Sequence, residues 1–161
     1  MRLKEVIPEV VYGGVDGTIS TFAVVAGSFG GGLTLKATFI LGVASLVADG
    51  FSMAVGSYLS AQSDNDRHPL RNGIVTFISF VILGSLMLWP YLGGIMFEWA
   101  EAPVFVGSAV LAGVSFMIVG GLKSRVQKSS LLRGAAEVVI LGFIAAGIAY
   151  LLGDVLEAAI T

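Results

Sequence analysis

The stretch Pro103–Leu122, PVFVGSAVLAGVSFMIVGGL, decides the fold class of this chain, because none of its 20 residues carries a charge. A helix needs about 20 mostly apolar residues to cross the hydrocarbon core of a bilayer. The alternation of apolar and polar residues that marks a strand of a membrane β-barrel is absent. Since lipid offers the backbone no hydrogen-bond partners, the segment is predicted to be a transmembrane helix.

Four further segments have the same character. The five predicted spans cover approximately residues 9–29, 37–61, 73–95, 103–122 and 134–153. Only 12% of the residues are charged, against about 25% in a soluble domain. We therefore expect an all-α integral membrane protein with five transmembrane helices, forming one domain over residues 1–161. The 22 glycines suit helices that pack with their backbones close together.

The positions of the cations predict the orientation in the membrane. Only Lys36 lies in a first or third connection, whereas 8 of the 9 Lys and Arg residues precede the first span or lie in the second and fourth connections. Positively charged connections stay in the cytoplasm. The N-terminus is therefore predicted to be cytoplasmic and the C-terminus to lie outside.

Four acidic residues fall within the predicted spans: Glu9, Asp16, Asp49 and Glu137. A charge at the centre of a bilayer costs about 2.5–3.5 kcal/mol or more, so such residues need a proton, water, or a bound cation. Glu9 and Asp16 are seven residues apart and share one stripe of the first helix. These acids indicate a path for protons, for cations, or for both.

The second span combines two kinds of metal ligand. Asp49 and Met53 are four residues apart and share a helix face, with Ser45 one turn earlier. A carboxylate suits hard or borderline divalent ions, and a thioether is a soft ligand. This mixture favours iron(II) and its neighbours over calcium or magnesium. Because carboxylates also bind protons, metal and proton would compete for the site, which is the physical basis of antiport.

Each of these residues also has a structural interpretation. Met53 alone could be packing, and Asp16-Gly17 could mark a break in the first helix. Glu137 could pair with Arg133 one turn earlier, and Glu9 could be a solvated helix end. The run 63–66 is most simply a solvated loop. Close helix packing is predicted at three stripes of small residues: Gly13 and Gly17, then Ser52, Gly56 and Ser60, then Ala109 and Gly113.

Several stretches resemble one known family. Tyr12–Gly27, YGGVDGTISTFAVVAG, and Ala48–Ser60, ADGFSMAVGSYLS, resemble the first and second helices of the vacuolar iron transporter family. The segments Gly121–Arg125, Leu132–Glu137 and Ala149–Gly153 are similar to the final hairpin of that family. The resemblance follows the order of the family over nearly the whole chain.

The resemblance implies a five-helix protomer and a symmetric homodimer with the transport path at the dimer interface. It also implies export of iron(II) or manganese(II) from the cytosol in exchange for protons. Asp16 and Met53 fall on positions that line the metal path, and Glu9 falls on an acidic position near its cytoplasmic mouth. We expect a multi-pass protein, in the plasma (inner) membrane if the chain is prokaryotic, with no permanently bound cofactor and no nucleic-acid partner.

Two departures from the family pattern matter. Ser45 stands where members with a well-defined iron site carry a glutamate, and Asp49 supplies an acid one turn later. The connection 62–72 is too short for the helical metal-gathering domain that many members insert there, so the chain resembles the short branch of the family. The competing hypothesis is a non-transporting membrane scaffold built on a structural helical dimer. An enzyme is not expected, because no nucleophile–base pair is evident and no histidine lies within a span.

Overall fold

The computed structural model describes residues 6–160, and this part of the chain is helical without any strand. Its elements are α1 (Ile7–Gly30), α2 (Leu35–Ser63), α3 (Pro69–Ser85), a 3₁₀ turn η2 (Leu86–Leu88), α4 (Trp89–Phe97), α5 (Glu101–Gln127) and α6 (Leu131–Ile160). Five helical segments are long and apolar enough to cross a membrane, with α3, η2 and α4 together forming the third. The prediction of an all-α protein with five spans is confirmed.

The third span differs from the continuous helix predicted over 73–95. Pro90 has no backbone N–H, and its ring crowds the carbonyl four residues earlier, so the α-helix is interrupted by η2 just before it. The buried Ser108 hydroxyl of α5 donates a hydrogen bond of 2.7 Å to the Met87 carbonyl in this turn. Helix α5 thus provides a hydrogen-bond donor to a backbone carbonyl in the turn that interrupts the third span.

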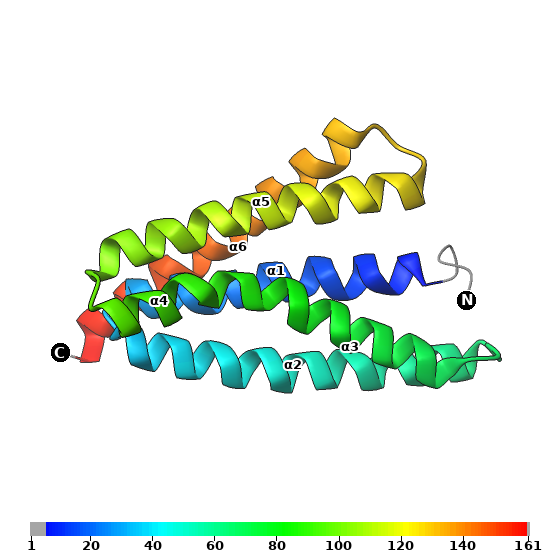
Figure 1. The fold of residues 1–161 in the computed structure, drawn as a ribbon, viewed down its shortest axis with the longest axis horizontal. Helices are drawn as coiled ribbons and strands as arrows, with labels where there is room; N and C mark the ends of the chain where they lie inside the picture. The colour runs from blue at the N-terminus through cyan, green and yellow to red at the C-terminus, as the bar shows by residue number, and fades with distance from the viewer. Residues whose placement is uncertain (1–5, 161) are drawn as a thin grey trace.

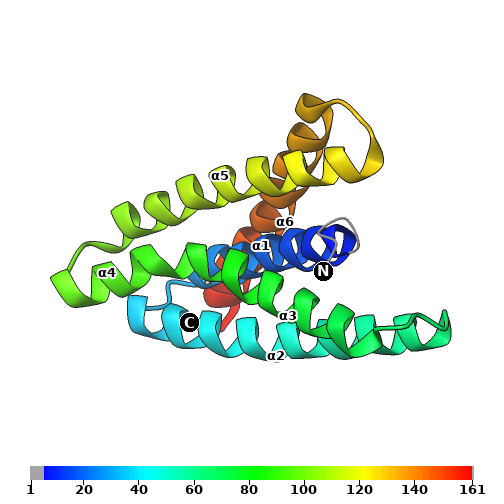
Figure 2. The same cartoon turned by 45° about the vertical axis from the view of Figure 1, so that its right-hand side comes forward.

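Helix α1 runs through the middle of the bundle. Figures 1 and 2 show it between the α5–α6 pair on one side and the α2–α3 pair on the other, and it packs against α3 and α6 above all. Gly13 and Gly17 allow the close approach to α3, because an added Cβ would collide with the carbonyls of Thr76 and Phe80. The predicted packing role of this small-residue stripe is confirmed, and it operates within the chain.

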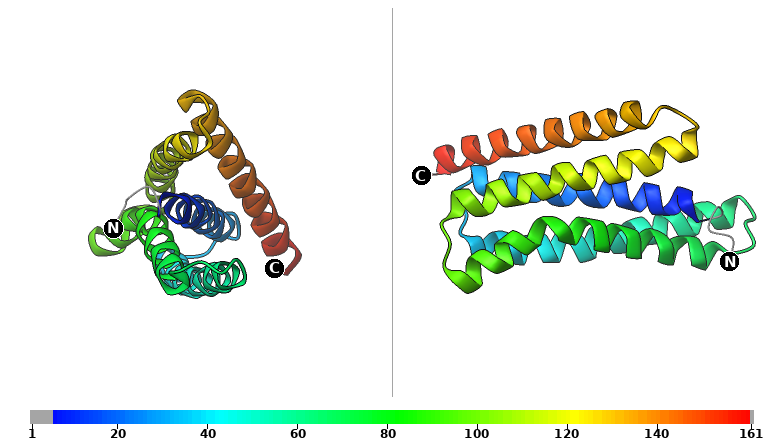
Figure 3. Two further views of the ribbon diagram at one scale, coloured as in Figure 1. Left: turned by 90° about the vertical axis from the view of Figure 1, so that its right-hand side faces the viewer. Right: turned by 45° about the horizontal axis from the view of Figure 1, so that its top comes forward.

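The two ends of the bundle carry different charges. The start of α1, the α2–α3 loop and the α5–α6 loop lie at one end, and the α1–α2 loop, the α4–α5 loop and the end of α6 lie at the other (Figures 1 and 3). The first end holds every described cation except Lys36, and the second holds Glu98, Glu101, Asp154 and Glu157. Arg2 and Lys4 fall outside the described residues. The geometry therefore groups the connections as the charge argument requires.

Candidate functional site

A polar stripe runs along the outer surface of α1 and α2. On α1, Tyr12 and Asp16 are exposed, one turn apart. On α2, exposed or half-buried small and acidic side chains recur every three or four residues: Ser45, Asp49, Ser52, Gly56 and Ser60. This spacing places them on one face of the helix. Asp16 and Asp49 therefore lie on the surface of the single chain and not in its core.

The structure brings Asp16 and Asp49 together from two different helices. The charge of Asp49 lies near enough to act on the carboxyl group of Asp16. Two charged carboxylates near each other repel, and a shared proton or cation would relieve this repulsion. The Ser45 hydroxyl donates a hydrogen bond to the Asp49 carboxylate and fixes its orientation. This pair is the strongest candidate for a cation or proton site in the chain.

The interpretation of Asp16-Gly17 as a helix break is wrong. Helix α1 continues from Ile7 to Gly30, and Gly17 faces α3 while Asp16 is exposed. The Ser20 hydroxyl donates a 2.7 Å hydrogen bond to the Asp16 carbonyl, in the manner of a serine within a helix. The carboxylate of Asp16 therefore does not serve to cap an interrupted helix.

Met53 lies in a different environment from Asp49. It is half-buried and packs against the hydrophobic core, in which Phe22, Phe80 and Phe116 are fully buried. Asp49, one turn earlier, is exposed. The structure thus places the thioether at the margin of the polar stripe, and this conformation agrees with the packing interpretation of Met53.

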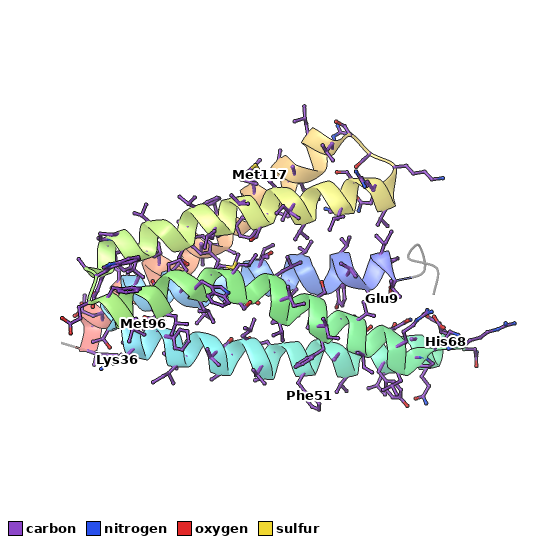
Figure 4. The ribbon with its side chains drawn as sticks, viewed as in Figure 1. Glu9, Lys36, Phe51, His68, Met96 and Met117 are labelled. Atoms are coloured by element: carbon purple, nitrogen blue, oxygen red, sulfur yellow. The ribbon has the colours of Figure 1, made fainter. Side chains whose placement is uncertain are left out.

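A cavity of about 360 Å³ opens where α1, α2 and the α2–α3 loop meet at the cation-rich end. Glu9, Tyr12, Ser60, Asp64 and Asp66 are among the residues that line it. One carboxylate oxygen of Glu9 is buried and has no hydrogen-bond partner among the described residues. Figure 4 shows Glu9 near the end of α1, at the same end of the bundle as His68. The polar stripe therefore leads from this cavity toward Asp16 and Asp49.

Sequence reasoning missed the two aspartates of this cavity, because it treated 63–66 as solvated loop. Asp66 accepts hydrogen bonds from the His68 backbone N–H, at 2.8 Å, and from the buried Asn72 side chain, at 3.1 Å. These hydrogen bonds lower the pKa of the Asp66 carboxyl below its usual value. An acid three residues before Pro69, the first residue of α3, was the available signal, since aspartates in turns commonly accept a hydrogen bond from the backbone two residues further on.

Glu137 forms an ion pair of 2.8 Å with Lys123 of α5, and not with Arg133 as the i,i+4 spacing suggested. Spacing along one helix reveals only the partners on that helix, whereas the α5–α6 hairpin brings Lys123 across from the neighbouring element. The pair lies on the α5–α6 hairpin, apart from the stripe on α1 and α2. The structure does not bring Glu137 together with the other predicted site residues.

One chain supplies an incomplete set of metal ligands. Within residues 6–160, no group of three or more Asp, Glu, His or Cys residues is close enough to hold a metal ion. First-row divalent ions usually take four to six ligands. Asp16 and Asp49 would therefore need ligands from another source, such as serine hydroxyls, water, Met53 or a second copy of the chain.

Comparison with known proteins identifies relatives of this chain. The sequence profile of the VIT family matches residues 7–68 and 64–154. A vacuolar iron transporter from Toxoplasma gondii is 39% identical over 63 residues, which are 39% of this chain and 21% of the relative. Vacuolar iron transporters from Plasmodium berghei and Plasmodium falciparum are 33% and 32% identical over 63 residues, covering 23% of each.

The aligned segment thus spans between a fifth and a quarter of these three relatives. The two family matches meet within residues 64–68, in the α2–α3 loop. Together they cover far more than half of the chain, including all five spans over most of their length. This multi-pass membrane protein belongs to the VIT family.

Proposed function

We propose that this protein exports a divalent first-row metal ion, iron(II) or manganese(II), from the cytoplasm, and that Asp16 and Asp49 bind the ion in transit. The observation that supports this proposal best is the pair of interacting carboxylates exposed on neighbouring helices within the spans. Each charge left facing lipid costs about 2.5–3.5 kcal/mol or more. A bound cation or a covering polar surface is needed to offset that cost.

A second copy of the chain would provide the cover. The stripe on α2 is unoccupied within the chain, since a Cβ added at Gly56 meets nothing within 4 Å. A two-fold contact places the same patch of both subunits face to face. Two copies related in this way would contribute four carboxylates, from Asp16 and Asp49 of each. This arrangement supports a symmetric homodimer with the path at the interface.

The ligand types support the choice of ion and the coupling to protons. Oxygen ligands suit manganese(II) and iron(II), and the Met53 thioether, one turn beyond Asp49, would favour iron(II) over calcium or magnesium. Carboxylates bind protons as well as metal ions, so a proton can take the place of the metal at these acids. Exchange of protons for metal at one site is antiport. Glu9, with its unpartnered buried oxygen in the cavity, would form the cytoplasmic entrance.

The test uses the purified protein in proteoliposomes that contain a metal-sensitive dye and a pH-sensitive dye. Iron(II), manganese, cobalt, zinc and calcium are offered in turn, with and without a proton gradient. Uptake of iron(II) or manganese together with proton exit is the expected result. Absence of uptake for every ion, from protein shown to be folded, would contradict transport. The scaffold hypothesis is less favoured, because the relatives that the chain matches are named as iron transporters and α1 is continuous at Asp16.

A further inference from the structure

A groove of about 440 Å³ lies between α5 and α6 at the cation-rich end of the bundle. Its walls are mostly apolar, with Met117 and Ile118 on α5 and Leu131 and Leu132 on α6. Gly121 lies on the α5 wall without a side chain, which leaves room in the groove. Arg125 is the charged residue in the lining. The groove therefore combines an apolar interior with a cation.

The loop beside the groove carries more positive charge than its own acids offset. Lys123 is paired with Glu137. Arg125, Lys128 and Arg133 form no ion pair with another described residue. These three cations lie within nine residues of the chain, in the short hairpin that joins α5 to α6. A fixed cluster of like charges is stabilised by an anion.

The helix dipoles favour an anion at the same place. Arg125 and Lys128 lie at the C-terminus of α5, where the dipole favours cations. Arg133 is different, because it lies in the first turn of the 30-residue helix α6, where the dipole disfavours a cation. The free backbone N–H groups of that turn favour a negatively charged ligand. Dipole compensation therefore accounts for the α5 cations but not for Arg133.

We propose that this groove binds an anionic phospholipid of the surrounding leaflet. The acyl chain would lie along the apolar walls, and the phosphate would lie between Arg125 and the first turn of α6. Basic pockets between transmembrane helices commonly bind anionic lipid headgroups. A free phosphate ion would use the cations but none of the apolar surface, so the combination of both features selects a lipid. The site lies on α5 and α6, apart from the stripe on α1 and α2.

Native mass spectrometry of the intact detergent-purified protein tests the headgroup half of the site. The protein is titrated with phosphatidylglycerol or with phosphatidylcholine of identical acyl chains. We expect at least fivefold greater retention of phosphatidylglycerol. Arg125→Gln reduces this preference at least threefold, whereas Lys36→Gln, which removes a cation at the other end, leaves it unchanged. Equal retention of the two lipids, or equal effects of the two variants, would overturn the proposal.

A second pair of variants tests the apolar half. Gly121→Leu fills the groove and is expected to reduce phosphatidylglycerol retention at least threefold. Gly147→Leu is the control, because Gly147 lines a separate, uncharged groove beside Phe143 and Tyr150. An added Cβ meets nothing within 4 Å at Gly147, and at Gly121 it meets the flexible Leu131 side chain of the groove wall at 3.3 Å. Equal losses in both variants would indicate general lipid contact and would contradict a specific site.

A competition experiment distinguishes a bound lipid from a bound free anion. It does not require either glycine variant to fold. Glycerol 3-phosphate carries the headgroup chemistry without acyl chains. Retention of phosphatidylglycerol in the presence of a hundredfold excess of this compound is expected. Its displacement would show that the cations bind a free phosphate, and the lipid site would be rejected.

Discussion

The Ser45 hydroxyl donates a hydrogen bond to the Asp49 carboxylate one turn further along α2. This contact places a neutral donor beside an acid that also interacts with Asp16 across the helix pair. This hydrogen bond limits the rotamers of the Asp49 side chain. Ser45 therefore supports the acid of Asp49 and does not itself supply one.

Asp16→Asn is expected to abolish metal uptake into proteoliposomes while the protein remains folded. The substitution removes the charge at nearly constant volume, and the exposed side chain makes no core contact that would be lost. Asp154→Asn, in the last turns of α6 at the acidic end, is the matched control and should transport normally. Normal uptake by Asp16→Asn would exclude the proposed site.

Ser45→Ala and Asp49→Ala should both raise the metal concentration for half-maximal uptake, but to different extents. Asp49→Ala removes a ligand, so we expect a rise of tenfold or more in the metal concentration for half-maximal uptake. Ser45→Ala removes only the supporting hydrogen bond, which is exposed, so a smaller rise is expected. The double variant should resemble Asp49→Ala alone. Additive effects would show that Ser45 acts independently of the carboxylate.

Gly17→Ala and Gly56→Ala should differ in thermal stability. An added Cβ at Gly17 would lie 2.5 Å from the Phe80 carbonyl oxygen, so α1 and α3 would have to separate. Overpacking of this kind costs about 1–3 kcal/mol. At Gly56 the added methyl group meets nothing within the chain, and alanine favours the helix by about 1 kcal/mol. Thermal unfolding in detergent should show a lower midpoint for Gly17→Ala and an unchanged or higher one for Gly56→Ala.

The contribution of Asp66 to stability should depend on pH. Its pKa is lowered by the hydrogen bonds from His68 and Asn72, so the stabilisation is present above the unfolded pKa of about 3.9 and is lost as the pH falls through the lower folded value. Thermal midpoints of the parent protein and Asp66→Ala should therefore differ above about pH 5 and converge below about pH 4. Asp64→Ala, in the same loop, is the control. A difference independent of pH would contradict this account.

Glu137→Gln is expected to leave metal uptake unchanged. Glu137 is paired with Lys123 on the α5–α6 hairpin, away from the α1–α2 stripe, so the loss of its charge should not reach the path. The ion pair is partly exposed, and its loss should lower stability by about 1 kcal/mol or less. Loss of uptake comparable to that of Asp16→Asn would place Glu137 on the path after all.

The sequence was sufficient to predict the spans because a bilayer imposes a length and an apolar composition that a single segment must meet by itself. The interruption before Pro90 could have been predicted from the residue type and was missed. The ion pair of Glu137 with Lys123 and the hydrogen bond from Asn72 to Asp66 each join two different elements. Spacing along one helix does not reveal such contacts. The proximity of Asp16 and Asp49 has the same origin. Their spans could be predicted, but not that α1 and α2 present both acids to the same surface.

The close packing of α1 against α3 has an electrical consequence. With Gly13 and Gly17 pressed against the backbone of α3, α1 cannot slide or rotate past α3, so we expect Asp16 to keep one depth in the membrane as long as the bundle does. A charge that moves across the membrane responds to voltage by about 2.3 kcal/mol per 100 mV, whereas a charge at fixed depth does no work against the field. Any voltage dependence of this protein should therefore arise from the ions that pass through it.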